Sequence, residues 1–360
     1  MNARPANTGN RIDAASQPGL VSVIIPTFNS AALISQTLQS VLWQLHRPME
    51  LIIVDDGSTD ATAEVVSEFE AQHAGDEGFE VHYFYQPNAG GARARNAGLI
   101  LSRGEYIQFL DADDILSRTK IARQYERLKG LSGDVAAYGA WAYFEKSQRG
   151  YRIFKTYGER HAANQLIDWI GGWFVPTHSI LWKRATIAAL GPWDEQLRAD
   201  QDGEYALRFL RAGGKFLFVD RSQAYYRQAQ NLKKIASTVS RRATEESIQS
   251  RIGLAQRLEA HFIERNALDA LARNALARRY FEIARHWTQS HPDIRRQCLA
   301  EFERLSDSHS ITASFLSRTM YRVFGFTFTQ KLKHLIRGRI GVPRQFRARA
   351  VPSLEHMCAL

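Results

Sequence analysis

The feature that most constrains the fold is a short apolar segment that runs into a cluster of acids. Residues 105–110 are mostly apolar and follow Gly104, and Asp111, Asp113 and Asp114 come directly after them. Such a segment is typical of a strand buried in a parallel sheet, whose carboxyl end lies where α/β proteins form ligand crevices. Oxygen-rich clusters without imidazole suit a hard cation such as Mg²⁺ or Mn²⁺, which can bind a diphosphate. Such acids also occur in solvated turns that cap helices, so the surrounding sequence has to decide between the two interpretations.

Two earlier segments have the pattern of buried strands that end at polar turns. Residues 20–25 are rich in β-branched side chains and stop at Pro26, and residues 51–54 run into an acidic turn that contains Asp56. Apolar residues recur at helical spacing over residues 33–42 between them, which predicts a strand–helix–strand unit.

A third strand is expected at residues 81–85. It leads into residues 86–98, which are rich in glycine and arginine, and the acidic strand follows. The carboxyl ends of parallel strands meet at one edge of a sheet. We therefore expect acids, glycines and arginines to gather at that edge.

The order and spacing of these segments resemble the family-2 glycosyltransferases over about residues 20–225. These enzymes use nucleotide-sugar donors and have the GT-A fold, an α/β fold with a Rossmann-like, mostly parallel sheet flanked by helices. The resemblance implies that the turn after the first strand, with Pro26, Thr27 and Asn29, lines the nucleotide pocket.

The same resemblance assigns roles to four further residues. It implies that Asp56 hydrogen-bonds the base, Arg95 packs beside the nucleotide, Asp111 lies near the ribose and Asp113 binds the metal. A carboxylate can accept from a base N–H, and an arginine or a metal can neutralise phosphate charge. The implied ligands are Mg²⁺ or Mn²⁺ and a nucleotide-diphosphate sugar as donor.

Residues 199–208 have the pattern of a helix start that is rich in acids. The family places its general base here, as the Asp of a Glu-Asp pair six residues before an Arg. Alignment on Arg208 assigns the base to Asp202 and puts Gln201 where the family has Glu, with Asp200 as the second candidate. The resemblance implies an inverting transfer in which Asp202 takes the proton of the acceptor hydroxyl. Acids at a helix N-terminus also stabilise the helix through its dipole, which is the alternative role for Asp200.

Aromatic residues are frequent between the acidic strand and the expected base. Their flat faces suit sugars, but each one is more readily explained as part of the core. Residues 171–179 contain the glycines and the proline of a loop, which we expect near the acceptor. His178 in this loop either binds acceptor or phosphate or makes a structural hydrogen bond. The aromatic residues between the acidic strand and the expected base are Trp141, Tyr143, Phe144, Trp169, Trp173, Phe174 and Trp182.

Length and charge predict more than one structural region. The chain has 360 residues and a net charge of +10, yet residues 1–230 contain 24 Lys and Arg against 26 Asp and Glu. Residues 231–360 contain 23 against 11, so the basic character lies in the C-terminal third. We expect a disordered N-terminal tail at 1–19, a GT-A domain at 20–230, a basic helical region at 231–342 and a flexible tail at 343–360.

The C-terminal region also bears on location. Residues 311–360 hold 9 Lys and Arg with Glu355 as the single acid, and apolar side chains are interleaved with the basic ones. A segment of this composition can bind an anionic membrane surface or simply pack onto the catalytic domain. No apolar run approaches the roughly 18 residues of a membrane span. Cys298 and Cys358 have no metal or disulfide spacing, which favours a reducing compartment. We expect a cytoplasmic protein that lies peripherally on the inner face of the cell membrane.

Three classes of function are compatible with these features. The first is a metal-dependent inverting glycosyltransferase that acts on a glycan or lipid-linked acceptor in the synthesis of a cell-surface polysaccharide or glycoconjugate. The second is a nucleotide-sugar-binding protein without catalytic activity, suggested by Gln201 and Gly203. The third is nucleic-acid binding, which has only the basic charge in its favour and no recognisable motif, so we expect no nucleic-acid partner.

Overall fold

The computed structural model describes residues 16–160, 162–228, 244–286, 288, 290–306 and 349–360. The described residues divide into two compact units. The first contains residues up to 169, residues 173–228 and residues 349–360, and the second contains residues 170–172 and 244–306.

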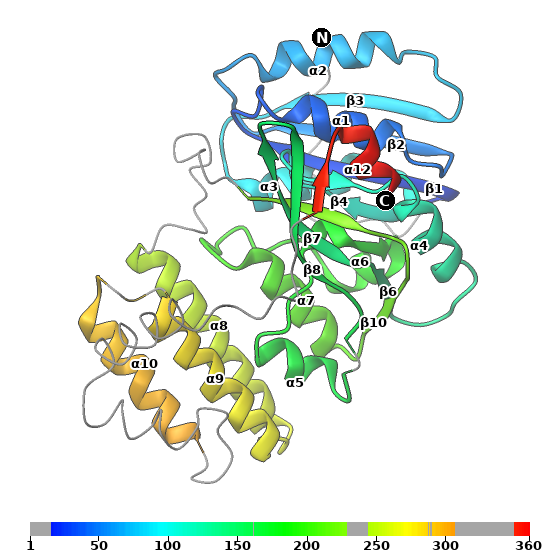
Figure 1. The fold of residues 1–360 in the computed structure, drawn as a ribbon. Helices are drawn as coiled ribbons and strands as arrows, with labels where there is room; N and C mark the ends of the chain where they lie inside the picture. Colours follow the sequence, from blue (N-terminus) through cyan, green and yellow to red (C-terminus); the bar gives the residue numbers. More distant parts are fainter. Residues whose placement is uncertain (1–15, 161, 229–243, 287, 289, 307–348) are drawn as a thin grey trace. The chain divides into compact units, whose positions relative to one another are not determined.

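The first unit is built on a seven-stranded sheet with the order β10-β6-β9-β4-β1-β2-β3 (Figure 1). Neighbouring strands are parallel except at β9, which is antiparallel to both β4 and β6. Every residue of β2 is buried, as expected for a strand covered on both faces. The strands are β1 Gln17–Thr27, β2 Met49–Asp55, β3 Phe79–Tyr85, β4 Gly104–Phe109, β6 Val135–Tyr138, β9 Ile180–Lys183 and β10 Lys215–Phe218.

Helices pack on this sheet and position the loops at its edges. α3 packs on β1 and β2, and α1 packs against α2, as Figure 1 shows. Close approach of α3 to β1 requires glycine at position 98, because a Cβ there would lie 2.4 Å from the Ile24 side chain. The helices are α1 Ile34–Leu42, α2 Thr62–Gln72, α3 Gly91–Leu101, α4 Lys120–Leu128, α5 Gln165–Ile170, α6 Arg184–Leu190 and α7 Gln201–Arg211.

A second, five-stranded sheet belongs to the same unit and has the order β12-β8-β7-β11-β5. One of its faces forms a small core that includes Phe144 and Tyr225. Its strands are β5 Ile115–Leu116, β7 Trp141–Ser147, β8 Gly150–Tyr157, β11 Ala224–Arg227 and β12 Arg349–Val351.

The C-terminal residues differ from the flexible tail expected at 343–360. Residues 349–351 form β12, which pairs antiparallel with β8, and Leu354–Ala359 form helix α12. Met357 and Cys358 are buried, and the Tyr225 hydroxyl donates to the Met357 carbonyl at 2.8 Å. Burial of these side chains orders a segment that has no strong local signal of its own.

The second unit contains helices α8 Glu245–Glu264, α9 Ala270–His286 and α10 Pro292–Leu305, so the additional C-terminal helices of the predicted fold class are present. Thr244 is the N-cap of α8, and its side chain accepts from the Ser247 N–H; α10 has Pro292 at its start. α9 packs against both α8 and α10. Most of the basic segment at 311–360 lies outside the described residues.

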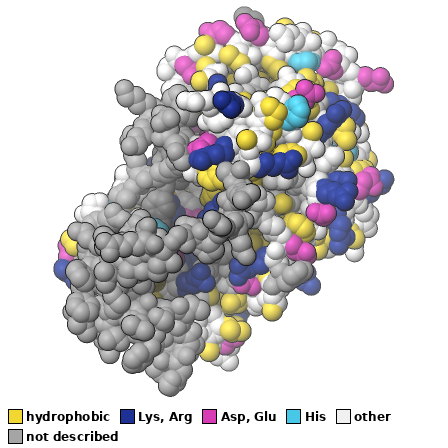
Figure 2. Space-filling view, in the orientation of Figure 1, with side chains coloured by type: hydrophobic (Ala, Val, Ile, Leu, Met, Phe, Trp, Pro, Cys, Tyr) yellow, Lys and Arg dark blue, Asp and Glu magenta, His cyan; other side chains and the backbone are white. Residues whose placement is uncertain are grey.

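None of the helices in the described part of the chain has the length and apolarity needed to cross a bilayer. On the face drawn in Figure 2, the Lys and Arg side chains of the described residues are mixed with acidic and hydrophobic ones. The described surface in this view therefore carries no continuous basic patch.

Candidate active site

The carboxyl ends of β1, β2 and β4 lie at one edge of the seven-stranded sheet. Thr27 is in register with Asp55, and the Asp56 N–H donates to the Thr27 carbonyl at 2.8 Å. The Leu110 N–H donates to the Ile24 carbonyl at 3.0 Å, which brings Asp111 to the same edge. The acids that follow β2 and β4 therefore lie at the same edge, on either side of the end of β1.

The turn after β1 is fixed by the turn after β2. Asn29 has a φ of 48°, a conformation that asparagine tolerates better than most residues. Its N–H donates to Ser58 Oγ at 2.8 Å, and its Oδ1 accepts from the Thr59 N–H at 2.8 Å. Thr27 is buried, and its Oγ1 has no hydrogen-bond partner among the described residues, whereas Pro26 is half-buried.

Asp56 is buried and organises the loop that precedes α3. Its Oδ1 accepts from Gln86 Nε2 at 2.7 Å and from the Ala89 N–H at 2.8 Å, and its Oδ2 accepts from the Gly90 N–H at 2.7 Å. The side chain thus already has three donors within the chain.

Arg95 joins α3 to the acidic strand. Its Nη2 donates to Asp111 Oδ1 at 2.6 Å, and its guanidinium lies over the Trp193 ring at 4.9 Å. Burial lowers the pKa of Arg95, but the charges of Asp111 and Asp202 outweigh burial and raise this pKa above its ordinary value. Arg95, Asp111 and Asp202 therefore share one electrostatic environment.

Asp113 and Asp114 have different surroundings although they are adjacent. Asp114 is buried, with Oδ2 2.7 Å from His178 Nδ1 and Oδ1 accepting from the Arg227 N–H at 2.9 Å. Burial and the charges of Asp114 and Asp111 raise the pKa of Asp113 to about 7, although the charge of Arg227 opposes them. The charges of Asp114 and Asp111 near Asp113 are therefore compensated only in part by the charge of Arg227.

His178 lies beneath this turn and does not reach the surface. It is fully buried, which favours the structural role among the alternatives given above. Burial lowers its pKa, but the charge of Asp114 and the hydrogen bond to it raise the pKa of His178 above its ordinary value. Its Nε2 has no hydrogen-bond partner in the described part of the chain.

Arg227 is a residue that the sequence did not single out. Its Nε donates to the Asp113 carbonyl at 2.6 Å and its Nη2 to Gln36 Oε1 at 3.0 Å, and its guanidinium lies 4.5 Å from the Phe144 ring centroid. Arg227 is buried and belongs to β11, more than a hundred residues after the acids. No local motif marks this contact.

Asp202 lies in the first turn of α7. Burial raises its pKa to about 6, the charge of Arg95 opposes this rise, and the charge of Asp111 adds to it. Gln201 is close to the same arginine, with its Oε1 3.4 Å from Arg95 Nη1. Asp200 precedes the helix with a φ of 61°, and a Cβ at Gly203 would lie 2.3 Å from Asp200 Oδ1. Glycine at 203 therefore leaves room for the Asp200 carboxylate at the helix start.

Asn96 holds the segment that leads to α7. Its Oδ1 accepts from the Trp193 N–H at 2.8 Å, and its Nδ2 donates to the Trp193 carbonyl at 3.0 Å and to Glu195 Oε1 at 2.8 Å. Trp193 also stacks on Tyr205 of α7 with ring centroids 4.4 Å apart. This contact explains how α3 and α7 are fixed relative to each other.

The donor set at the acidic strand fits a hard divalent cation. Asp111 and Asp113 offer carboxylate oxygens, and a magnesium-type ion usually takes one or two protein carboxylates and completes its shell with substrate phosphates and water. Burial is the main cause of the raised pKa of Asp113, and the charges of Asp114 and Asp111 that add to it are what such an ion would neutralise.

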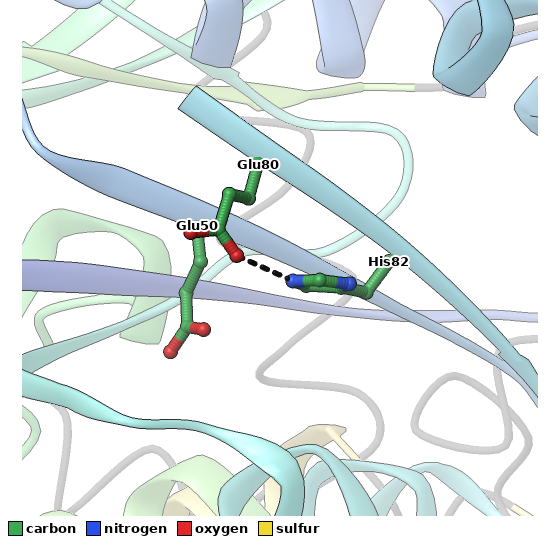
Figure 3. A group of neighbouring side chains, drawn as sticks. All are labelled: Glu50, Glu80 and His82. Carbon is green, nitrogen blue, oxygen red and sulfur yellow. Dashed lines mark hydrogen bonds and ion pairs between the residues drawn. The ribbon is translucent and has the colours of Figure 1, made fainter. Parts of the chain in front are cut away.

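Among the described residues, a second group of possible metal ligands lies away from the acidic strand. Ligand atoms of Glu50, Glu80 and His82 all lie within 4.8 Å of one another (Figure 3). Arg103 already donates to both glutamates, and Glu50 Oε1 also accepts from Ser22 Oγ at 2.6 Å. The guanidinium therefore supplies the positive charge there, and we assign this group to structure.

The aromatic residues between the two acidic segments differ in how deeply they are buried. Trp141, Phe144, Trp169, Trp173 and Trp182 are buried in the core, as the more general expectation held. Tyr143 is half-buried and Phe174 is 38% exposed.

Comparison with known proteins agrees with this geometry. The sequence profile described as Glycosyl transferase family 2 matches residues 22–187. The uncharacterized glycosyltransferase alr2836 of Nostoc is 30% identical over 243 residues, which cover 65% of this chain and 72% of that protein. The putative teichuronic acid biosynthesis glycosyltransferase TuaG of Bacillus subtilis is 43% identical over 107 residues, 30% of this chain and 41% of that protein. Glycosyltransferase GlyG of Streptococcus pneumoniae is 32% identical over 138 residues, but the match spans only 44% of its length.

Two solved structures share the fold. Staphylococcus aureus TarS, residues 1–349 in complex with UDP-GlcNAc, matches with a TM-score of 0.53 at 17% identity, over 80% of this chain and 81% of that one. The mannosyltransferase PcManGT from Pyrobaculum calidifontis, in complex with GDP-Man and Mn²⁺, matches with a TM-score of 0.51 at 19% identity. The match covers 91% of this chain and 88% of PcManGT.

The fold and the acidic edge define a protein of the GT-A class, as predicted. The chain belongs to glycosyl transferase family 2.

Proposed function

We propose that the protein is a metal-dependent, inverting glycosyltransferase that moves a sugar from a nucleoside-diphosphate donor to a glycan or lipid-linked acceptor. The observation that carries the proposal is the meeting of Asp111, Asp113, Arg95 and Asp202 at the carboxyl edge of the sheet. Ligands of open α/β sheets bind at this edge.

Asp202 is the general base in this proposal. Burial raises its pKa to about 6, so the carboxylate is ionised at neutral pH. This pKa is also close enough to neutral pH for the carboxylate to accept a proton during the reaction. It would take the proton of the acceptor hydroxyl as that oxygen attacks the anomeric carbon, with no covalent intermediate on the protein.

The donor is held by groups of opposite charge. Arg95 and Arg227 place two buried guanidiniums near Asp111 and Asp113, where negative phosphate charge would otherwise be repelled. Asp113, with Asp111 beside it, would hold Mg²⁺ or Mn²⁺. When bound, the ion neutralises charge on the departing diphosphate.

The nucleoside is assigned to the turns after β1 and β2. Pro26, Thr27 and Asn29 lie on the first turn, and Asp56 fixes the loop before α3 with three hydrogen bonds. Asp111 would contact the ribose. Asp56 either accepts a hydrogen bond from the base directly or positions the backbone of loop 86–90, which then contacts the base.

Named ligands of related proteins support this reading. TarS was solved with UDP-GlcNAc and PcManGT with GDP-Man and Mn²⁺, and TuaG is named for teichuronic acid biosynthesis. These names favour a nucleotide-sugar donor, a divalent metal and a cell-surface polymer as product.

We further propose that the basic C-terminal segment holds the enzyme peripherally on the cytoplasmic face of an anionic membrane. The support is its composition, 9 Lys and Arg with Glu355 as the single acid at 311–360. Because residues 349–360 pack into the first unit, the test should keep the chain whole. We expect the full chain to sediment with anionic liposomes at low salt and a variant with its basic residues at 318–339 changed to Gln to remain in solution. Equal sedimentation would contradict this location.

A thermal-shift panel of UDP-, GDP- and dTDP-sugars with Mn²⁺ or Mg²⁺ tests the proposed function. A ligand at 100 times its Kd adds about 2.7 kcal/mol of stability. We expect one nucleotide class to raise the melting temperature in a metal-dependent way. No shift with any of them would contradict donor binding.

A further inference from the structure

One face of the five-stranded sheet carries a row of aromatic side chains from three strands. Tyr143 of β7 is in register with Phe154 of β8 and with Tyr226 of β11. Two residues before Tyr143 on β7, Trp141 is in register with Tyr157, and the rings of Trp141 and Tyr157 stack with centroids 4.0 Å apart. We call Tyr143, Phe154, Tyr157 and Tyr226 the aromatic strip.

Core packing covers this strip only in part, because Tyr143, Tyr157 and Tyr226 pack against the main hydrophobic core and still keep exposed area. The alternate residues of the same strands, such as Phe144, Ile153 and Tyr225, are buried in the small core on the other face. All four members of the strip are only half-buried, although Trp141 at its base is buried. A row of half-exposed aromatic side chains is unusual in a core and is suited to the apolar faces of sugar rings.

The strip is continuous with the acidic site. The ring of Tyr226 lies 5.5 Å from that of His178, whose Nδ1 is 2.7 Å from Asp114 Oδ2. The next residue, Arg227, donates to the Asp113 carbonyl at 2.6 Å. The charges of Asp114 and Asp111 add to burial in raising the pKa of Tyr226, as expected for a ring beside those acids.

A bulge brings a cation over the strip. The register between β7 and β8 shifts between Ala142 and Tyr143, and Lys155 is the extra residue, with a φ of 54°. Its exposed side chain places Nζ 5.0 Å from the Tyr157 ring centroid and 5.9 Å from that of Tyr143. Bulges next to active sites commonly re-aim a side chain, and a strained backbone at such a position points to a role.

We propose that the aromatic strip is the acceptor subsite and takes a carbohydrate chain whose sugar rings stack on Tyr143, Phe154 and Tyr226, with an acidic group of that chain bound by Lys155. This inference rests on the proposed function and deepens it, because it names the acceptor as an acidic glycan. The acidic group is a carboxylate or a phosphate, since either one pairs with an ammonium.

A glycan microarray that carries neutral, uronic-acid-containing and phosphodiester-linked glycans tests the subsite with the full chain. We expect the wild-type protein to bind acidic glycans, and Phe154→Ala to bind them at least about tenfold more weakly. Phe154→Tyr, which keeps the ring, should bind like the wild type. Phe84→Ala is the matched control, because Phe84 is a half-buried phenylalanine on the edge strand β3 of the other sheet.

The Lys155→Met variant on the same array separates the contribution of ring stacking from that of charge recognition. Lys155→Met should lose the preference for acidic over neutral glycans while retaining binding to the neutral sugar backbone. The array then also shows which acid is recognised, because uronic-acid and phosphodiester glycans occupy different spots. An unchanged preference in Lys155→Met overturns the role of the ammonium.

Calorimetry of UDP and GDP with Mn²⁺ distinguishes failure of this inference from failure of the proposed function. We expect unchanged nucleotide affinity in Phe154→Ala, which also shows that the variant is folded. Nucleotide binding by a wild-type protein that binds no glycan, or equal glycan binding by Phe154→Ala and Phe84→Ala, overturns the subsite alone. Absence of nucleotide binding in the wild type would instead count against the proposed function.

Discussion

Arg95 on α3 donates from Nη2 to Asp111 Oδ1 at 2.6 Å and thereby ties a helix to the carboxyl end of β4. The two side chains are unequally buried, because the Arg95 side chain is 9% exposed and that of Asp111 is 31% exposed. The arginine also lies near Asp202, where burial raises the pKa of the carboxyl group and the charge of Arg95 opposes that rise. One buried cation is therefore close both to Asp111, on the proposed donor side, and to Asp202, the proposed base.

The first prediction concerns this arginine. Arg95→Met keeps much of the packing on Trp193 but removes the charge, which leaves Asp111 without its partner. We expect a loss of about 2–3 kcal/mol in the free energy of unfolding, toward the low end for a broken buried pair because Asp111 is partly solvated. Urea denaturation measures it. A double-mutant cycle with Asp111→Asn should show coupling between the two sites, and strictly additive losses would contradict the pairing.

A second prediction separates the metal from the base of the nucleotide. Asp113→Asn should abolish the enhancement of nucleoside-diphosphate binding by Mn²⁺, whereas Asp56→Ala should weaken nucleoside binding with or without metal because it releases loop 86–90. Calorimetry with UDP and GDP, each with and without Mn²⁺, provides the comparison. Retention of the full metal effect in Asp113→Asn would remove Asp113 as the ligand.

A third prediction uses a buried lysine that the mechanism does not need. Lys120 at the start of α4 is fully buried, its Nζ hydrogen-bonds Gln108 Oε1, and burial lowers its pKa well below the ordinary value. Between that lowered pKa and about 10.5 the unfolded chain binds a proton that the folded chain does not. Stability should therefore rise with pH in this window, by up to about 1.4 kcal/mol per pH unit.

Urea denaturation from pH 7 to 10 measures this slope. Lys120→Met should flatten it, and Lys129→Met, which alters an exposed lysine just after the same helix, should leave it unchanged. The same slope in the wild type and in Lys120→Met would show that Lys120 is charged in the folded protein.

The strands that carry the site could be predicted because their signals are local. Residues 20–25, 51–54 and 105–110 are apolar runs that end at polar turns, and each forms a strand of the parallel part of the sheet. The geometry of parallel strands predicted that these ends meet at one edge, and the family resemblance then implied the roles of the residues there.

The remaining contacts depend on residues far apart in sequence. β12 has three residues and pairs with β8 across almost two hundred positions, and Arg227 reaches Asp113 from β11. Neither segment has a periodicity or turn signal that would identify its partner. The three donors to Asp56 come from loop 86–90, whose conformation the sequence leaves open.

A fourth prediction concerns this C-terminal segment. Met357 is fully buried beside Tyr225, and its replacement by aspartate would bury an unpaired charge in the small core. We expect Met357→Asp to cost about 3 kcal/mol or more in unfolding free energy. It should also weaken nucleotide binding in Mn²⁺, because Tyr225 and Arg227 share β11.

Glu355→Gln is the control, since Glu355 is exposed on the same helix α12. Both variants should be compared by urea denaturation and by calorimetry with the nucleotide. If Met357→Asp is as stable as Glu355→Gln, then residues 349–360 are not an integral part of the first unit.

The most direct test of the central claim is the turnover of Asp202→Asn, measured together with its donor affinity and its pH dependence. In the wild type, kcat/KM should rise with pH through about 6, because the base must be ionised and burial raises the pKa of Asp202 to about that value. Asp202→Asn should bind the donor as tightly as the wild type but turn over at least about 10²-fold more slowly. Asp200→Asn should retain most of the wild-type activity. Wild-type turnover in Asp202→Asn would contradict the assignment of Asp202 as the general base.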